Sequence, residues 1–184
     1  MILLRHGQSL FNLHFTETRR DPGIEDPPLT ERGQAQAEAA AATLDGETIS
    51  RLVVSPYTRA LQTAAPLLAR RDLTVEIEPL IRERFHFACD IGSPPAVLAD
   101  RFPDHDFAHL ESRWWPDGTE DADQVVDRAR LFRERMAARP DWAETVVVSH
   151  WAFILALTGT SLGNGEWLRY DPHAAPPSEL CWQP

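Results

Sequence analysis

Short segments rich in β-branched and aliphatic residues alternate along this chain with longer segments of helical periodicity. The strand-like segments are Ile2–Leu4, Leu52–Val54, Leu73–Ile77 and Val146–Val148. Short apolar runs bounded by polar residues are typical of strands that are buried on both faces. The alternation predicts an α/β fold: a single three-layer α/β/α domain over residues 1–184, with a mainly parallel sheet.

Apolar residues at helical spacing predict the helices of this fold. A first helix is expected after Thr30, its N-cap, and a second with Ser55 and Pro56 as its N-cap and first residue. The most regular amphipathic pattern lies within residues 121–138. A last helix is predicted from about 151 to 159, where a glycine ends it.

Residues 85–120 lack this regularity. They are rich in Pro, Phe, Trp, His and Asp, which predicts an irregular insertion carrying one short helix around Pro95–Arg101. The tail after Tyr170 contains several prolines and is predicted to be a surface extension.

The charge balance excludes several classes of partner and chemistry. The net charge is −10, from 28 acidic against 18 basic residues. A field of this sign repels nucleic acid and anionic membranes, so neither is expected as a partner. All basic residues are arginines. The absence of lysine excludes Schiff-base catalysis and a P-loop lysine.

The apolar runs, the N-terminus and the cysteines of this chain are those expected of an ordinary soluble globular protein. No apolar run approaches the length of a membrane span, and no signal-peptide pattern follows Met1. Cys89 and Cys181 are too few for a disulfide framework or a four-ligand zinc site, and both are expected to be free. A cytoplasmic location is the default expectation.

Cationic and imidazole side chains follow three of the predicted strands. Arg5 and His6 end the first strand, His150 follows the last, and Arg59 lies near the start of the helix after the second. In open α/β sheets, ligands bind beyond the carboxyl ends of the strands. If these strands are neighbours, their cations converge and repel one another unless they bind an anion. A dianionic phosphate fits, because guanidinium groups bind its oxygens in pairs.

The motifs around these residues resemble those of the histidine phosphatase superfamily, which contains cofactor-dependent phosphoglycerate mutases and many phosphomonoesterases. Arg5-His6-Gly7-Gln8-Ser9, followed by Asn12, is similar to the signature of the family. Further similar blocks occur in the family's order over most of the chain: Pro28–Ala35, Ser55–Ala64, Ile81–Glu83 and Val147–His150. The segment around Cys89-Asp90 resembles a small, phosphatase-type branch of phosphoglycerate mutase-like proteins.

This resemblance implies roles for individual residues. His6 would be the nucleophile that forms a phosphohistidine, and Glu83 matches the position of the proton donor. The groups that would hold the phosphoryl oxygens are Arg5, Arg59 and His150, assisted by Asn12 and Ser9. Asp90 and His86 are reserve candidates for proton transfer. Fixed cations would supply the charge neutralisation, so no metal or other cofactor is expected.

Two features of the sequence leave alternatives open. The family usually has glycine after the second histidine, whereas this chain has Trp151. Its ring could narrow the pocket or stack on a substrate, or it could pack against the sheet. The insertion, including His86, Trp114 and Trp115, could form a lid that selects the leaving group, or a hydrophobic flap that completes the core.

The sequence therefore predicts a metal-independent phosphatase that hydrolyses a small phosphorylated metabolite through His6. One alternative is a cofactor-dependent phosphoglycerate mutase, which the short chain and the lack of lysine disfavour. Another is a protein that binds a phosphorylated ligand without turnover, which the complete set of expected catalytic residues disfavours. The natural substrate and the oligomeric state are not encoded in these motifs.

Overall fold

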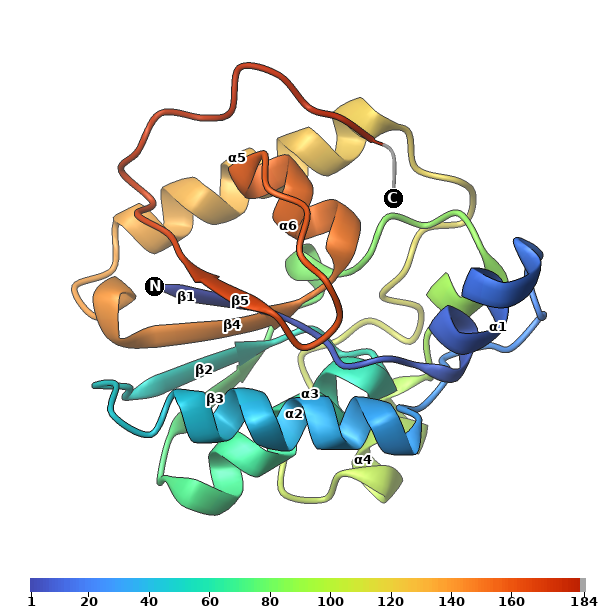
Figure 1. Ribbon diagram of the computed structural model, residues 1–184, viewed down its shortest axis with the longest axis horizontal. Helices are drawn as coiled ribbons and strands as arrows, with labels where there is room; N and C mark the ends of the chain where they lie inside the picture. The colour runs from blue at the N-terminus through green and yellow to red at the C-terminus, as the bar shows by residue number, and fades with distance from the viewer. Residues whose placement is uncertain (183–184) are drawn as a thin grey trace.

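The centre of the protein is a five-stranded sheet with the order β3-β2-β4-β1-β5 (Figure 1). It is seen in a computed structural model, which describes residues 1–182. The strands are β1 (Ile2–Arg5), β2 (Arg51–Val54), β3 (Thr74–Ile77), β4 (Thr145–Ser149) and β5 (Trp167–Arg169). The first four are parallel and β5 runs antiparallel to β1. The predicted α/β fold with a mainly parallel sheet is confirmed.

Helices cover both faces of the sheet and give the three layers (Figure 1). On one face lie α2 (Glu31–Thr43) and α3 (Thr58–Arg70), and on the other α5 (Ala122–Ala137) and α6 (Trp151–Thr158). Helix α1 (Leu10–Thr18) lies beyond one end of the strands, and α4 (Pro95–Arg101) lies on the side of α2 and α3, with Leu98 in the same core. Short 3₁₀ turns are Pro79–Ile81, Ala88–Asp90 and Trp142–Glu144.

Alternate residues of the central strands enter opposite cores. Val146 and Val148 of β4 pack with α2 and α3, whereas Val147 packs with α5 and α6. Leu3 of β1, which lies beside Val147 in the sheet, is fully buried in the second core. Burial on both faces explains why these strands appear as uninterrupted apolar runs.

The ends of three helices agree with the sequence. Thr30 caps α2 by accepting a hydrogen bond from Gly33 N at 3.0 Å. The amphipathic helix α5 begins after Asp121, which forms a reciprocal capping pair with Gln124. Helix α6 ends at Gly159, whose φ of 73° favours glycine.

The predicted start of the second helix is wrong. Ser55 and Pro56 precede the helix, and α3 begins only at Thr58. Asp26, a residue distant in sequence, takes the capping role instead: its carboxylate accepts from Thr58 N at 2.8 Å and Thr58 Oγ at 2.6 Å. This frees the Ser55 hydroxyl for a contact with His150.

Two elements were not predicted from the sequence. Strand β5 has three residues and its alternation is too brief to be recognised. Helix α1 follows directly on the β1 exit, with Ser9 as its N-cap.

A close approach of backbones fixes the turn between β1 and α1. A Cβ atom on Gly7 would lie 2.3 Å from Gly33 O, and one on Gly33 would lie 2.1 Å from Gln8 O. Neither position has room for a side chain, so the start of α2 packs directly on the residues that follow His6.

The insertion over residues 85–120 contains α4, the 3₁₀ turn at Ala88–Asp90 and irregular chain. Trp114 from this segment is buried, donates from its indole N–H to Ser93 O at 2.9 Å and packs on Tyr57. Trp115 packs against the same core. These two tryptophans therefore complete the core, as in the flap alternative, and do not line the cleft described below.

Replacing Trp114 by Ala is expected to lower the free energy of unfolding by about 3–5 kcal/mol, because it removes a buried ring and leaves a cavity. Chemical denaturation measures this loss. Trp115→Ala, at a half-buried neighbour, is the matched comparison and is expected to cost less. A Trp114→Ala protein of unchanged stability that reorders its substrate preferences would instead support a lid.

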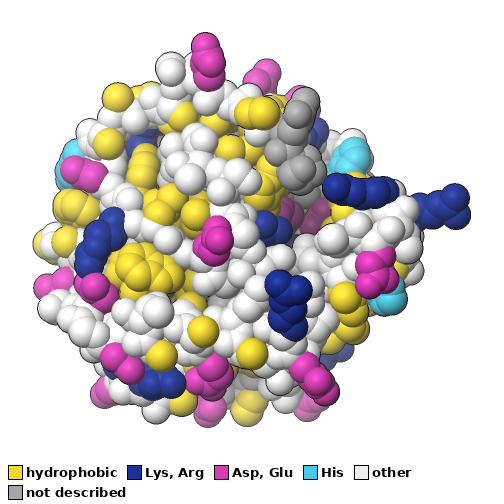
Figure 2. Space-filling model, in the orientation of Figure 1, with side chains coloured by type: hydrophobic (Ala, Val, Ile, Leu, Met, Phe, Trp, Pro, Cys, Tyr) yellow, Lys and Arg dark blue, Asp and Glu magenta, His cyan; other side chains and the backbone are white. Residues whose placement is uncertain are grey.

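The tail from residue 171 to 182 is irregular and passes over α5 and α6, in agreement with the predicted surface extension (Figure 1). On the face shown in Figure 2, arginine and acidic side chains are interspersed. Within residues 1–182, no helix has the length and apolar character needed to cross a bilayer. Cys89 and Cys181 are both free, as expected.

Candidate active site

The expected cationic residues converge where the central strands end. Strands β1 and β4 are neighbours, with Arg5 beside Ser149, and β2 is the other neighbour of β4. His6 and His150 follow β1 and β4 directly, and their ring centroids are 5.0 Å apart. Arg59 lies in the first turn of α3, which follows β2. Sheet topology thus brings together residues from three segments that are distant in sequence.

His6 is buried, and its hydrogen bonding defines which ring nitrogen is reactive. Nδ1 lies 2.7 Å from Gly7 O, an acceptor, so Nδ1 carries the proton and Nε2 keeps its lone pair. Burial and the nearby Arg59 and Arg5 lower the pKa of His6 well below its ordinary value. The ring is therefore neutral near pH 7 and its Nε2 can act as a nucleophile.

The two guanidinium groups are anchored but not saturated. Arg5 donates to Leu162 O at 2.6 Å, and its buried Nε has no partner among the described residues. Arg59, 2% exposed, donates to Cys89 O at 2.8 Å and to Asp90 Oδ1 at 3.3 Å. Each group retains further N–H donors for an anion.

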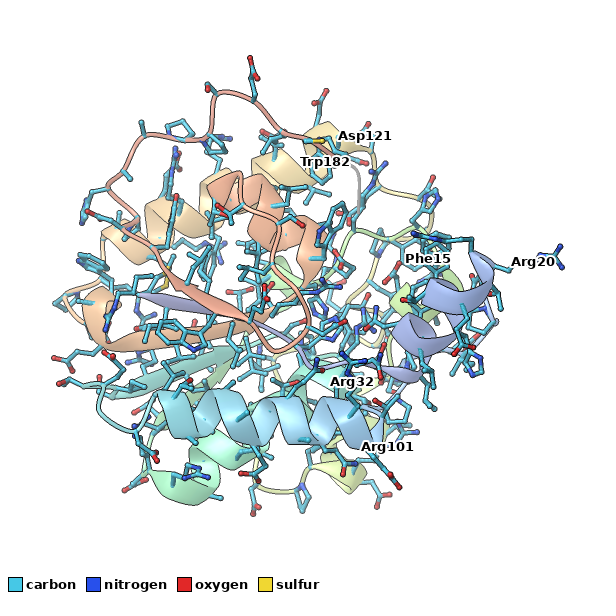
Figure 3. The ribbon with its side chains drawn as sticks, in the orientation of Figure 1. Phe15, Arg20, Arg32, Arg101, Asp121 and Trp182 are labelled. Atoms are coloured by element: carbon cyan, nitrogen blue, oxygen red, sulfur yellow. The ribbon has the colours of Figure 1, made fainter. Side chains whose placement is uncertain are left out.

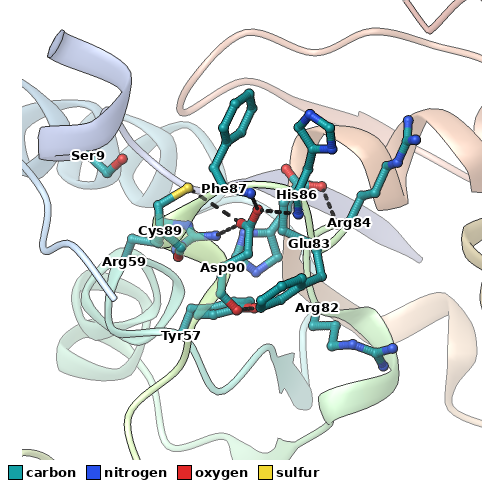
Figure 4. Close-up of polar contacts among 12 residues, drawn as sticks. Ser9, Tyr57, Arg59, Arg82, Glu83, Arg84, His86, Phe87, Cys89 and Asp90 are labelled. Atoms are coloured by element: carbon teal, nitrogen blue, oxygen red, sulfur yellow. Dashed lines mark hydrogen bonds and ion pairs between the residues drawn. The ribbon is translucent and has the colours of Figure 1, made fainter. Parts of the chain in front are cut away.

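Asp90 is fully engaged in holding this cluster (Figure 4). Besides Arg59, its carboxylate accepts from the backbone N–H groups of His86 and Phe87, each at 3.0 Å. Its Oδ1 also accepts from Cys89 Sγ at 3.5 Å. These bonds make Asp90 an anchor for Arg59 and the surrounding loop, and they argue against its reserve role in proton transfer.

The side chain of Glu83, which belongs to the loop after the 3₁₀ turn Pro79–Ile81, contacts the N-terminus of α6. Its Oε1 accepts from Arg84 N and from Ala152 N, the second residue of that helix, both at 2.9 Å. Both bonds end on Oε1, which leaves Oε2 to carry a proton. Burial and the neighbouring Asp90 raise the pKa of Glu83. A carboxyl group with a raised pKa suits a general acid.

A buried ion pair holds the loop that carries Glu83. Both carboxylate oxygens of Glu120 accept from Arg128, each at 2.9 Å. The same guanidinium donates to Leu80 O at 2.6 Å and to Arg82 O at 3.1 Å. The main chain preceding Glu83 is thereby fixed from helix α5.

His150 is fully buried and is held by a residue whose role the sequence did not indicate. Its Nε2 lies 2.7 Å from Ser55 Oγ, while its buried Nδ1 has no partner within residues 1–182. Burial and the adjacent Arg59 lower the pKa of His150 well below its ordinary value. If Ser55 donates to Nε2, the proton lies on Nδ1, which can then donate to an anion.

Ser9 and Asn12 form the cap of α1. Asn12 Oδ1 accepts from Ser9 N at 3.1 Å, Ser9 Oγ at 3.0 Å and Asn164 Nδ2 at 3.2 Å. These three donors occupy the amide oxygen and leave the amide NH₂ group to donate elsewhere. Ser9 Oγ is itself used within the cap. The geometry therefore favours a direct substrate contact by Asn12, and a supporting position for Ser9.

A cleft of about 520 Å³ is lined by Arg5, His6, Arg59, Glu83, Ser9 and Asn12, whereas the fully buried His150 is not part of its lining. Trp151 lines it and donates from its indole N–H to Ser161 Oγ at 2.9 Å, which places its ring at the cleft. His86 also lines the cleft. The other aromatic residues that line the cleft were not predicted from the sequence: they are Phe11, Phe15, Phe87 and Trp182.

The sequence matches the histidine phosphatase superfamily (branch 1) over residues 1–182. Glucosyl-3-phosphoglycerate phosphatase of Mycobacterium tuberculosis is 30% identical over 209 residues, which cover 98% of this chain and 88% of that protein. The enzyme of that name from Mycolicibacterium vanbaalenii is 33% identical over 178 residues, covering 89% of this chain and 74% of its own.

Solved structures support the same assignment. The native structure of a mycobacterial glucosyl-3-phosphoglycerate phosphatase superposes with a TM-score of 0.64 at 29% identity, covering 91% of this chain and 87% of that one. A structure of the mycobacterial enzyme with inorganic phosphate gives a TM-score of 0.61 at 27% identity, covering 91% and 86%. The full-length sequence match and these phosphatase relatives agree with the expected fold and enzyme class: the chain belongs to the histidine phosphatase superfamily.

Proposed function

We propose that this protein is a metal-independent phosphatase that hydrolyses small phosphomonoesters through a phosphohistidine on His6. The observation that carries the proposal is the state of the His6 ring. It is buried and neutral, with its proton held on Nδ1 by Gly7 O, and it lies beside two partly unpaired guanidinium groups. The similarity to phosphatases supports the same reaction class.

The site offers several donors to a phosphate dianion. Arg5 and Arg59 would neutralise its charge, and the amide group of Asn12 and Nδ1 of His150 would each donate to a phosphoryl oxygen. Because these groups are held by contacts within the fold, they need little reorganisation as charge develops on the phosphoryl oxygens.

The first chemical step transfers the phosphoryl group to the enzyme. His6 Nε2 attacks phosphorus, the bond between phosphorus and the ester oxygen breaks, and its electron pair goes to that oxygen. Glu83 donates the proton from Oε2 to the departing oxygen, so that a neutral alcohol leaves. The products are phosphohistidine, the alcohol and the Glu83 carboxylate.

The second step returns the enzyme to its starting state. A water molecule attacks phosphorus, and the Glu83 carboxylate accepts its proton. The bond between phosphorus and Nε2 breaks, with the electron pair returning to the ring nitrogen. Inorganic phosphate leaves, and Glu83 is again protonated for the next substrate.

Hydrolysis of p-nitrophenyl phosphate in excess EDTA tests this mechanism. We expect the rate to be unchanged by the chelator, because the charge neutralisation is assigned to arginine side chains. Samples quenched in alkaline denaturant after brief mixing with ³²P-labelled substrate should carry label on His6, because phosphohistidine is stable in alkali and labile in acid. A rate that requires added divalent metal would reject the mechanism.

The same preparation distinguishes the two alternatives. Isomerisation of phosphoglycerate that depends on bisphosphoglycerate would identify a mutase. Phosphate binding without turnover of any ester would identify a binding protein.

A further inference from the structure

The outer part of the cleft is walled by aromatic rings. They come from three separate regions: helix α1, the loop and helix start near the catalytic groups, and the C-terminal tail. The residues concerned, here called the aromatic wall, are Phe11, Phe15, Phe87, Trp151 and Trp182. Figure 3 shows Phe15 on α1 and Trp182 on the tail.

Three of these rings form a closely packed group on one side. The rings of Phe11 and Phe15 are nearly parallel, and their centroids are 5.1 Å apart. Phe87 lies 5.2 Å from Phe11 and 5.1 Å from Phe15. Mutual packing fixes these rings, so a ligand would meet a preformed apolar surface.

The two indole rings line the same cleft. Trp151 and Trp182 meet edge to face, with centroids 6.5 Å apart. Trp182 is also contacted by the Arg84 guanidinium, 5.7 Å from its ring centroid, and Trp151 is tied to Ser161 by its indole N–H. These contacts hold both rings without covering them, since each remains partly exposed.

Two polar groups beside these rings are already partnered. Ser161 Oγ accepts from Trp151, and the amide oxygen of Asn12 is occupied by three donors. A leaving group rich in hydroxyls would lose its bonds to water on entering the cleft and would regain chiefly those that Arg84 and His86, which also line it, can offer. A flat apolar group would lose nothing of this kind and would gain contact with the rings.

We propose that the aromatic wall selects phosphomonoesters whose alcohol carries a planar aromatic group. This inference rests on the proposed function, because the phosphate is taken to lie at His6 and the alcohol to point outward. A volume of about 520 Å³ accommodates a small ligand of this type beside the phosphate.

Benzyl phosphate and glycerol 3-phosphate test the selection. Both release an alkyl alcohol, but the alcohol of the first carries an aromatic ring and that of the second carries two further hydroxyl groups. We expect kcat/KM to be at least about tenfold higher for benzyl phosphate. A higher value for glycerol 3-phosphate would overturn the proposal.

Variants locate the effect on the wall. Trp151→Ala and Phe15→Ala are each expected to lower the benzyl-to-glycerol ratio of kcat/KM by about fivefold or more, mainly through KM for benzyl phosphate. Trp151→Phe should restore most of the ratio, because it keeps an aromatic face. Trp142→Ala, at a half-buried tryptophan outside the cleft, is the matched control and should leave the ratio unchanged. An unchanged ratio in both wall variants would remove the wall from substrate selection.

Binding separates a failure of this inference from a failure of the proposed function. Benzylphosphonate and methylphosphonate cannot be hydrolysed at the P–C bond, so calorimetric titration compares their affinities in the unmodified protein whether or not it turns over esters. We expect benzylphosphonate to bind about tenfold or more tightly. Equal affinities would overturn the selection, whereas tighter benzylphosphonate binding without any ester hydrolysis would overturn only the proposed function.

Discussion

Replacing His6 by Ala is expected to reduce phosphomonoester hydrolysis by at least about 10⁴-fold, because the proposed covalent intermediate forms on its Nε2. Among residues 1–182 the His6 ring is hydrogen-bonded to Gly7 O of its own turn alone, so the fold should survive the change. Steady-state rates with p-nitrophenyl phosphate measure the loss, and thermal unfolding verifies that the variant is folded.

The control for this substitution is His14→Ala, which alters an exposed histidine on α1 and should leave the rate unchanged. Inorganic phosphate should still bind to the His6→Ala protein, since Arg5 and Arg59 remain. A folded His6→Ala protein that keeps a tenth or more of the activity would contradict the covalent mechanism.

Substituting Gln for Glu83 should lower kcat/KM for benzyl phosphate by about 10²–10⁴-fold, because the departing alkoxide is no longer protonated. The p-nitrophenolate ion leaves without that assistance. With p-nitrophenyl phosphate, the variant should therefore release a burst of about one equivalent of nitrophenolate and then turn over slowly, because water attack on the phosphohistidine lacks its base. Stopped-flow absorbance resolves the burst.

The pH dependence adds a second signature of Glu83. Its protonated form is the active one in the first step, so kcat/KM for benzyl phosphate falls as the pH rises through its pKa, which burial raises. The Glu83→Gln enzyme should lack this fall, and Glu134→Gln, at an exposed position on α5, should retain it. If kcat/KM of the Glu83→Gln enzyme falls in the same way as the pH rises, the proton donor is another group.

The central sheet and the phosphate end of the site could be predicted because each depends on local sequence. Apolar runs such as Val146–Val148 reveal strands buried on both faces, and a parallel sheet necessarily brings the residues after those strands to one edge. Arg5, His6 and His150 were therefore placed correctly from their positions alone.

The remaining features depend on contacts between distant segments. Ser55 has the residue type and neighbour of a helix cap, yet Asp26 caps α3 and the Ser55 hydroxyl contacts His150. The aromatic wall joins residues from α1 and the tail, and no periodicity links Phe15 to Trp182. Local patterns carry no information about such pairings, and the burial of Trp114 was equally unpredictable.

The tight contact between Gly7 and Gly33 has a consequence for how such an enzyme can diversify. Because two main chains touch there, any added methyl group would displace the turn that presents His6, so this part of the molecule tolerates almost no variation. The rings of the aromatic wall come from other segments of the chain. Descendants of this chain can thus exchange peripheral side chains around the cleft while the imidazole of His6 stays where it is.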